Sequence, residues 1–145
     1  MSQVILLTGA SGFIAKHIAL KLLNAGYNVR GTLRRLDRGE EVRAAVAPHL
    51  TGGAGELSFV QADLESDAGW AEAMVGISAL VHTASPFPAT QPKDPAALIR
   101  PAVEGTERVL KAAAAAGVGG VVLTSSTEAV LNEAKAYSLQ DEADW

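Results

Sequence analysis

Residues 4 to 15 read VILLTGASGFIA, an apolar run that leads through two glycines into a segment with helical spacing. Gly9 suits the tight turn out of a strand, and Gly12 removes the side chain that would keep a pyrophosphate away from a helix start. At that start the free N–H groups and the positive end of the helix dipole face an anion. Ala15 is small enough for the helix to pack closely on a sheet. The stretch therefore predicts a strand, a phosphate-binding turn and a helix.

The rest of the chain repeats this alternation of a short apolar run and a helical segment. Apolar residues that recur every three to four positions indicate the helices between the runs. Such alternation predicts one α/β domain with a Rossmann-type parallel sheet, helices on both faces and strands buried on both sides. The expected strands are Val4–Leu7, Val29–Leu33, Leu57–Val60, Ala79–His82 and Val121–Leu123, and the expected helices are the segment that carries Ile14, Ile18, Leu22 and Leu23, then Glu40–Ala47, Ala68–Val75 and Pro95–Ala116.

The composition argues against several classes of function. A net charge of -4 and a pI of about 5.3 supply no basic surface for nucleic acid. The chain has no cysteine, and its three histidines lie far apart, so no metal site is expected. Its longest weakly polar run falls short of the roughly 20 apolar residues that cross a bilayer. We therefore expect a cytoplasmic protein without a nucleic-acid or membrane partner.

A glycine-rich turn alone is a weak signal, but this one follows a strand and opens a β-α-β unit, the context that dinucleotide binding requires. The second expected strand ends in Arg34 and Arg35, about 20 residues after the glycines. An acid there would bond the 2'-hydroxyl of NAD, whereas a guanidinium pairs with the 2'-phosphate of NADP. Asp37 lies three residues too late to be the obvious acid. NADP is therefore favoured over NAD, with a solvated arginine pair as the alternative.

Together, the phosphate-binding turn, Arg34, ADL at 62–64, VHTASP at 81–86 and LTSS at 123–126 resemble the extended short-chain dehydrogenase/reductase superfamily. Within it, DPAALIRPAVEGTERVLKAA at 94–113 is most similar to the dihydroflavonol reductase and cinnamoyl-CoA reductase group. The resemblance covers nearly the whole chain but less than half of a typical member. It implies that residues 1–145 are the cofactor-binding part of a longer NADP-dependent oxidoreductase, with five or more strands and an incomplete C-terminal end.

The resemblance also assigns roles to single residues of this sequence. A helix N-cap is the alternative role for Asp63, and a small-residue turn ahead of Pro86 is the alternative for residues 83–85. The residues expected at the cofactor are Gly9, Ser11, Gly12, Phe13 and Ile14 around the pyrophosphate, Arg34 at the 2'-phosphate, Asp63 and Leu64 beside the adenine, and Thr83, Ala84 and Ser85 along the ribose groups.

In the resembled family a serine holds the substrate carbonyl, a tyrosine gives it a proton, and a lysine four residues after the tyrosine lowers the tyrosine's pKa. Ser126 best matches that serine. Ser125 is the second choice and is otherwise expected at the cofactor, and capping by the serine run is the plain alternative. Tyr137 does not fit, because Asp141 stands where the lysine should be. The implied activity is reduction of a ketone, aldehyde or acyl thioester, with little turnover by these residues alone.

Two other functions compete with a carbonyl reductase. A nucleotide-sugar epimerase or dehydratase of the same superfamily shares the turn but usually keeps NAD bound, and a non-catalytic dinucleotide-binding module would need no proton donor. The helix at 95–116 resembles one that packs against a second subunit, so a homodimer through it is expected, with a helix that lies only on its own sheet as the alternative. Pro101 conflicts with that helix, because it lacks the N–H for the helix ladder and should bend or break it.

Overall fold

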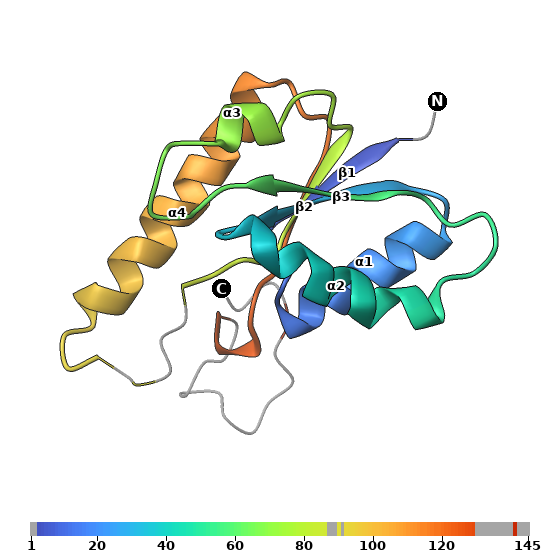
Figure 1. Cartoon of the computed structure of the whole chain (residues 1–145). Coiled ribbons are helices and arrows are strands. Elements are labelled where there is room, and N and C mark those ends of the chain that lie inside the picture. The colour runs from blue at the N-terminus through green and yellow to red at the C-terminus, as the bar shows by residue number, and fades with distance from the viewer. Residues whose placement is uncertain (1–2, 87–89, 91, 130–140, 142–145) are drawn as a thin grey trace.

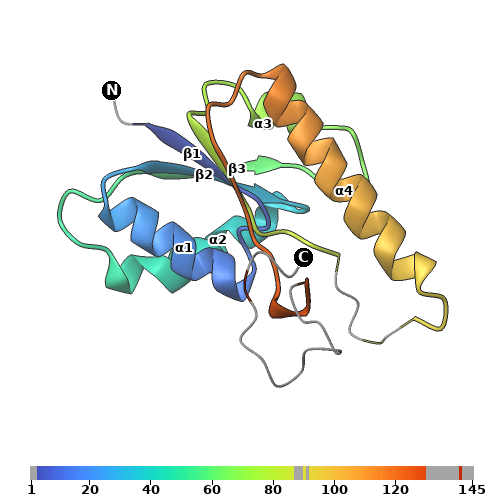
Figure 2. The same ribbon diagram turned by 180° about the vertical axis from the view of Figure 1, so that it is seen from behind.

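The computed structural model describes residues 3–86, 90, 92–129 and 141 of the chain. Five parallel strands form one sheet in the order β3-β2-β1-β4-β5, with helices on both faces (Figures 1 and 2). The Rossmann-type expectation is confirmed. The strands are β1 (Val4–Leu7), β2 (Asn28–Leu33), β3 (Leu57–Gln61), β4 (Ala79–His82) and β5 (Val121–Leu123), and the helices are α1 (Phe13–Asn24), α2 (Gly39–Val46), α3 (Trp70–Ala73) and α4 (Ala96–Ala115), with 3-10 turns η1 (Leu36–Arg38), η2 (Ala47–His49) and η3 (Thr127–Ala129).

Strand β1 lies at the centre and decides where the sheet opens. It pairs in parallel with β2 on one side and with β4 on the other, so that Ile5 stands opposite both Val29 and Ala79. The chain runs outward from β1 through β2 to β3, then returns to β4 and β5 on the other side. In open α/β sheets this reversal leaves a crevice outside the carboxyl ends of the strands.

The two helical layers follow from the alternation of side chains along the strands. Leu7 faces the layer of α1 and α2 and packs with Leu23, whereas Leu6 faces the other layer and packs with Trp70 and Val109. Figure 2 shows α1 and α2 together on one face of the sheet, with α3 and α4 on the opposite face. Because both faces are covered, β1 carries an uninterrupted apolar run.

Helix α3 is shorter than the expected Ala68–Val75, because Gly69 cannot belong to it. Gly69 has a φ of 86°, a left-handed conformation outside the α-helical region. It ends the loop that connects β3 to α3. Helix α3 therefore begins at Trp70. It ends at Ala73, with Met74 as its C-cap.

Two further expectations are wrong. Strand β5 is not buried on both sides, since Val122 is 62% exposed and only β4 pairs with it among the described strands. The break expected at Pro101 does not occur, because α4 is continuous from Ala96 to Ala115, and the bend expected as the other outcome stays a prediction. Its missing N–H costs the helix one bond, to the carbonyl of Ala97. The expected homodimer through residues 95–116 stays a prediction.

Gly69 and Gly76 form a matched pair that tests the loop before α3. Both have positive φ, so alanine should destabilise either position by about 1–2 kcal/mol. A Cβ at Gly69 would also lie 2.1 Å from the carbonyl oxygen of Gln61, whereas a Cβ at Gly76 meets nothing within 4 Å. We expect Gly69→Ala to lower the free energy of unfolding by about 1–3 kcal/mol more than Gly76→Ala. Equal effects in chemical denaturation would contradict the close approach.

Candidate functional site

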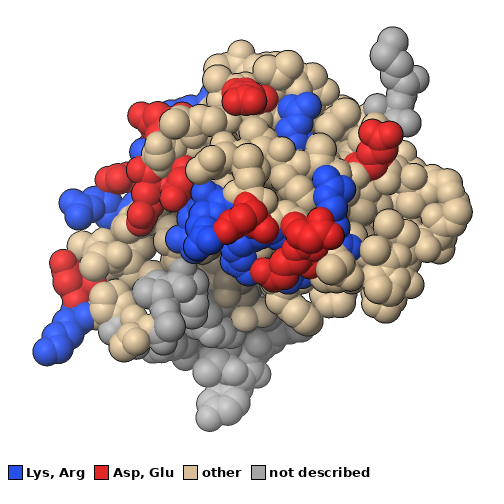
Figure 3. Space-filling view, in the orientation of Figure 1, with Lys and Arg blue, Asp and Glu red and all other residues tan. Residues whose placement is uncertain are grey.

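A groove of about 820 Å³ lies at the carboxyl ends of β1 to β4 and is closed on one side by the start of α4. Lysine and arginine side chains gather in the middle of this view of the molecule, with acidic side chains directly beside them (Figure 3). The lining residues are Gly9, Ser11, Gly12, Thr32, Leu33, Arg34, Arg35, Arg38, Ala62, Asp63, Leu64, Glu65, Trp70, Thr83, Ala84, Ser85, Pro86, Ala97, Leu98 and Pro101.

The turn after β1 has little room for side chains. Gly9 has a φ of 67°, and a Cβ there would lie 3.0 Å from the Cβ of Ala84. The Gly12 amide donates to the Gly9 carbonyl at 2.8 Å, and a Cβ at Gly12 would lie 3.2 Å from that same oxygen. Gly12 also stands at the N-cap of α1, where no side chain caps the helix. The turn thus presents bare backbone at a helix N-terminus, which suits an anion.

Thr8 joins this turn to the end of β4. Its hydroxyl oxygen lies 3.0 Å from the amides of Thr83 and Ala84, which donate to it, and 2.7 Å from Nδ1 of His82. The Thr83 hydroxyl donates to the Thr8 carbonyl at 2.6 Å. Burial lowers the pKa of His82, which is 1% exposed. The neutral imidazole is therefore the form that the fold accommodates.

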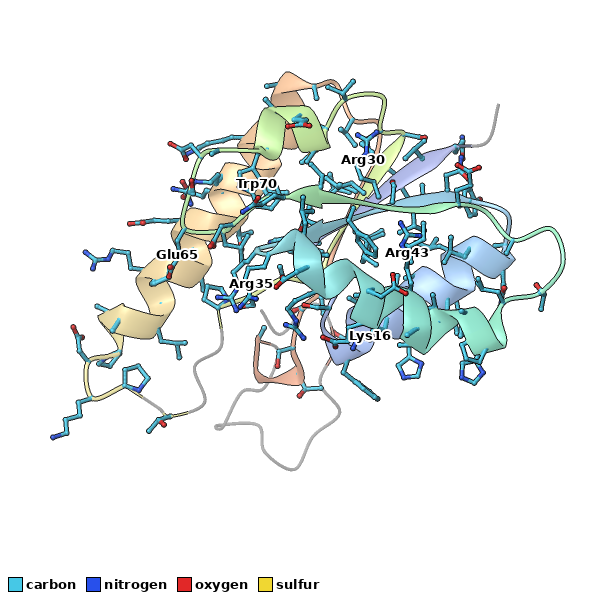
Figure 4. All side chains as sticks on the ribbon, in the orientation of Figure 1. Lys16, Arg30, Arg35, Arg43, Glu65 and Trp70 are labelled. Atoms are coloured by element: carbon cyan, nitrogen blue, oxygen red, sulfur yellow. The ribbon has the colours of Figure 1, made fainter. Side chains whose placement is uncertain are left out.

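Three arginines follow β2, and they differ in their partners. Arg35 bonds both carboxylate oxygens of Asp37, and this bond lowers the pKa of Asp37. Arg38 pairs with Glu41 at 2.7 Å and donates to the Ser11 hydroxyl at 3.3 Å. Arg34 is exposed, and no carboxylate of the described residues pairs with its side chain. Figure 4 shows Arg35 where β2 ends. Arg34 is thus the arginine in the groove whose charge is not matched.

The loop after β3 is held by donors to its backbone carbonyls. Nε1 of Trp70 lies 3.0 Å from the carbonyl oxygens of both Asp63 and Ser66, and Arg108 of α4 bonds the carbonyl of Leu64. Figure 4 shows Trp70 between α4 and β3. A Cβ at Gly105 would lie 2.9 Å from the Cβ of Leu64, so α4 fits closely against the loop. The backbone of Asp63 and Leu64 is therefore held in place where these residues border the groove.

The alternative N-cap role of Asp63 is wrong, since no helix begins at residue 64. Its carboxylate instead accepts the Glu65 amide at 3.1 Å, which is the bond of an Asx turn. The carboxylate therefore shapes the loop and still borders the groove.

Some expected site residues lie outside the groove lining. Phe13 and Ile14 begin α1 with exposed side chains. Ser125 and Ser126 follow β5 and are exposed, beyond the point where the Thr124 amide donates to the His82 carbonyl at 3.0 Å. The Ser126 carbonyl accepts the Ala129 amide at 3.0 Å. Tyr137 lies outside the described residues. The catalytic role of Ser126 and the cofactor role of Ser125 therefore stay predictions.

Several groove residues were missed by sequence reasoning. Thr32 accepts the Gly9 amide on its hydroxyl at 3.1 Å, and nothing in its local sequence marks this role. Arg38 carried a usable signal, because it is a third basic residue directly after Arg34 and Arg35. Trp70 carried no sequence signal of a role at the groove. Of these three residues, only Arg38 could have been assigned to the groove from the sequence, by its positive charge beside Arg34 and Arg35.

A second, more open hollow of about 630 Å³ lies between α3 and α4. Both of its cations are already paired, Arg108 with Asp67 and Lys111 with Glu107, whereas no cation of the described residues forms an ion pair with Glu104. Alanines of α4 form much of the remaining wall. Among the described residues it offers an anionic ligand no unpaired cation, which favours the groove at the strand ends as the functional site.

The described part of the chain contains neither a candidate metal centre nor a candidate membrane span. It holds no group of three or more histidine, cysteine or acidic side chains that could bind a metal ion. None of its helices is both long enough and apolar enough to span a bilayer.

Comparison with known proteins agrees with this geometry. The model of the NAD dependent epimerase/dehydratase family matches residues 5–144. Cinnamoyl-CoA reductase 1 of Petunia hybrida is 41% identical over 128 residues, which are 88% of this chain and 36% of that protein. Dihydroflavonol 4-reductase of Hordeum vulgare is 35% identical over 144 residues, which are 97% of this chain and 40% of that protein. These matches confirm the resemblance to that reductase group.

Solved structures of reductases share the fold. The yeast methylglyoxal/isovaleraldehyde reductase complexed with NADPH has a TM-score of 0.75 and 30% identity, over 92% of this chain and 40% of that one. Vestitone reductase from alfalfa has a TM-score of 0.75 and 29% identity, over 98% of this chain and 42% of that one. The chain spans about two fifths of the length of the relatives that it matches.

His82 makes stability depend on pH. Because burial lowers its pKa, the unfolded chain takes up the proton first as the pH falls. This contribution to stability is fully present above the unfolded pKa of about 6.5 and is lost as the pH falls towards the lower folded value. We expect the free energy of unfolding to fall by up to about 1.4 kcal/mol per pH unit in that window.

Urea unfolding between about pH 7.5 and pH 5 measures this dependence. His82→Asn should flatten it. A slope that persists in His82→Asn would assign the dependence to other groups.

Proposed function

The chain belongs to the NAD dependent epimerase/dehydratase family, and from that premise we propose that it is the NADP-binding part of a carbonyl reductase. The observation that carries the choice of NADP is Arg34, the groove arginine without a carboxylate partner among the described residues. A guanidinium pairs with a phosphate through two parallel hydrogen bonds. The named relatives, a cinnamoyl-CoA reductase and a dihydroflavonol 4-reductase, support a carbonyl substrate.

The residues of the groove fit a dinucleotide phosphate. At Gly12 a side chain would crowd the Gly9 carbonyl, and the uncapped start of α1 lies beside it. In the proposal, the backbone from Gly9 to Ile14 surrounds the pyrophosphate, and Arg34 binds the 2'-phosphate. Asp63 accepts a hydrogen bond from the adenine amino group, and Leu64 packs on the ring. Residues 83–85 border the ribose groups.

The chemical role of the chain is orientation. The cofactor supplies the hydride. Ser126 holds the substrate carbonyl by donating its hydroxyl hydrogen, and a phenol with a nearby cation gives the oxygen its proton. Neither tyrosine of this sequence has a lysine four residues on, because Gly31 follows Tyr27 at that spacing and Asp141 follows Tyr137. We place the proton donor in the part of the relatives that this chain does not match.

The role of Arg34 is tested by titrating the chain with NADPH and NADH. Arg34→Gln should weaken NADPH binding about tenfold or more, since a hydrogen bond to a charged group contributes about 1.5–3 kcal/mol. NADH, which lacks the 2'-phosphate, should bind the variant as it binds the unmodified chain.

Arg35→Gln is the matched control, because Arg35 is bonded to Asp37. It should change NADPH affinity less than threefold. If Arg35→Gln weakens NADPH as strongly as Arg34→Gln, the assignment of the 2'-phosphate to Arg34 fails. If the unmodified chain prefers NADH, the choice of NADP itself is withdrawn.

Turnover distinguishes cofactor binding from catalysis. We expect the purified 145-residue chain to bind NADPH yet to oxidise it no faster than a no-protein control in the presence of aldehyde or ketone substrates. Absorbance of NADPH at saturating cofactor measures this. Sustained turnover would place a proton donor within these residues and contradict the proposal.

A further inference from the structure

His82 and Thr8 lie at the ends of the neighbouring strands β4 and β1. This is the point in the sheet where the chain, after adding β2 and β3 on one side of β1, continues on the other side. Thr8 follows β1 and His82 is the last residue of β4. Their side chains meet with Nδ1 2.7 Å from the threonine oxygen. Residues 74 positions apart in the sequence thus join the phosphate-binding turn to the opposite wall of the groove.

The hydrogen bonds around Thr8 decide which nitrogen of His82 carries the proton. A threonine hydroxyl accepts two hydrogen bonds and donates one. The amides of Thr83 and Ala84 both donate to it, each at 3.0 Å. Its own hydrogen must therefore go to Nδ1 of His82, which accepts with its lone pair. His82 is then neutral, with its proton on Nε2.

The two amides that Thr8 orients belong to the groove. Thr83 and Ala84 both line it, and the Cβ of Ala84 lies 3.0 Å from where a Cβ at Gly9 would stand. The separation between the phosphate-binding turn and the β4 wall is therefore set where Ala84 meets Gly9. Rotation of the Thr8 hydroxyl towards any other acceptor would release one of the two amides.

Packing alone does not account for a histidine at this position. His82 is 1% exposed, and its buried Nε2 has no hydrogen-bond partner among the described residues. An unsatisfied buried polar group is costly, and an apolar side chain would avoid that cost. Within the described residues, the one hydrogen bond that the His82 side chain makes is the bond to Thr8.

We propose that His82 is a positioning residue for the cofactor, acting through Thr8 to hold the backbone of Thr83 and Ala84 against the phosphate-binding turn. This inference rests on the proposed function, because the groove that it shapes is the proposed NADP site.

Three variants of the chain test whether His82 acts as a hydrogen-bond acceptor for Thr8 or only fills space in the core. In His82→Asn the amide oxygen stands close to the position of Nδ1 and keeps the acceptor, whereas His82→Leu fills the space and removes it. We expect His82→Leu to weaken NADPH binding about tenfold or more and His82→Asn to remain within about threefold of the unmodified chain. Thr8→Val should weaken binding as strongly as His82→Leu, and combining Thr8→Val with His82→Leu should add little further loss.

Nitrogen-15 spectra of the histidine side chains test the network without the cofactor. At about pH 8 the unmodified chain should show His82 as the neutral form with a protonated Nε2 and an unprotonated Nδ1, assigned by the loss of its signals in His82→Asn. A proton on Nδ1 would overturn the inference even if the variants fold poorly.

The results distinguish failure of the positioning role of His82 from failure of the proposed NADP-binding function. If the unmodified chain binds NADPH and His82→Leu binds it equally well, or better than His82→Asn, the positioning role is overturned and the proposed function stands. If the unmodified chain binds neither NADPH nor NADH, the proposed function fails, and the positioning role fails with it.

Discussion

The parallel pairing of β1 with β2 on one side and β4 on the other is the constraint on which the rest of the structure depends. The chain adds β2 and β3 on one side of β1 and then β4 on the other side. The loops after β1 and β4 therefore diverge and leave the groove open between them. Four parts of the groove follow strand ends: the glycine turn after β1, Arg34 after β2, Asp63 after β3 and Thr83 after β4. The start of α4 closes one side.

The fold was largely predictable because its signals are local. The bounds of β1, β4 and β5 match the apolar runs of the sequence. The differences arise where tertiary structure decides. Gly69 ends a loop in a left-handed conformation and shortens α3, and the exposure of β5 depends on what lies beside it rather than on its own apolar sequence. Pro101 lies inside a continuous α4, although it removes one backbone hydrogen bond of the helix.

The parts of the site that could be predicted are those where the residue type itself indicates the ligand group, as glycine does for a pyrophosphate and arginine for a phosphate. The glycines and Arg34 lie in the groove lining, where the motif and its spacing put them. The network of Thr8 and His82 was not predictable, because its bonds join residues 74 to 76 positions apart. The choice between Arg34 and Arg35 likewise required the structure, since the sequence does not reveal that Asp37 is bonded to Arg35.

The central claim is that the groove at the strand ends, and not the hollow between α3 and α4, receives NADP. Amide nitrogen-15 spectra of the unmodified chain during a titration with NADPH test this most directly. The account predicts that the largest shifts fall on the amides of residues 9–14 and 83–85. Shifts confined to residues 104–116 of α4, or an unchanged spectrum at saturating NADPH, would contradict it.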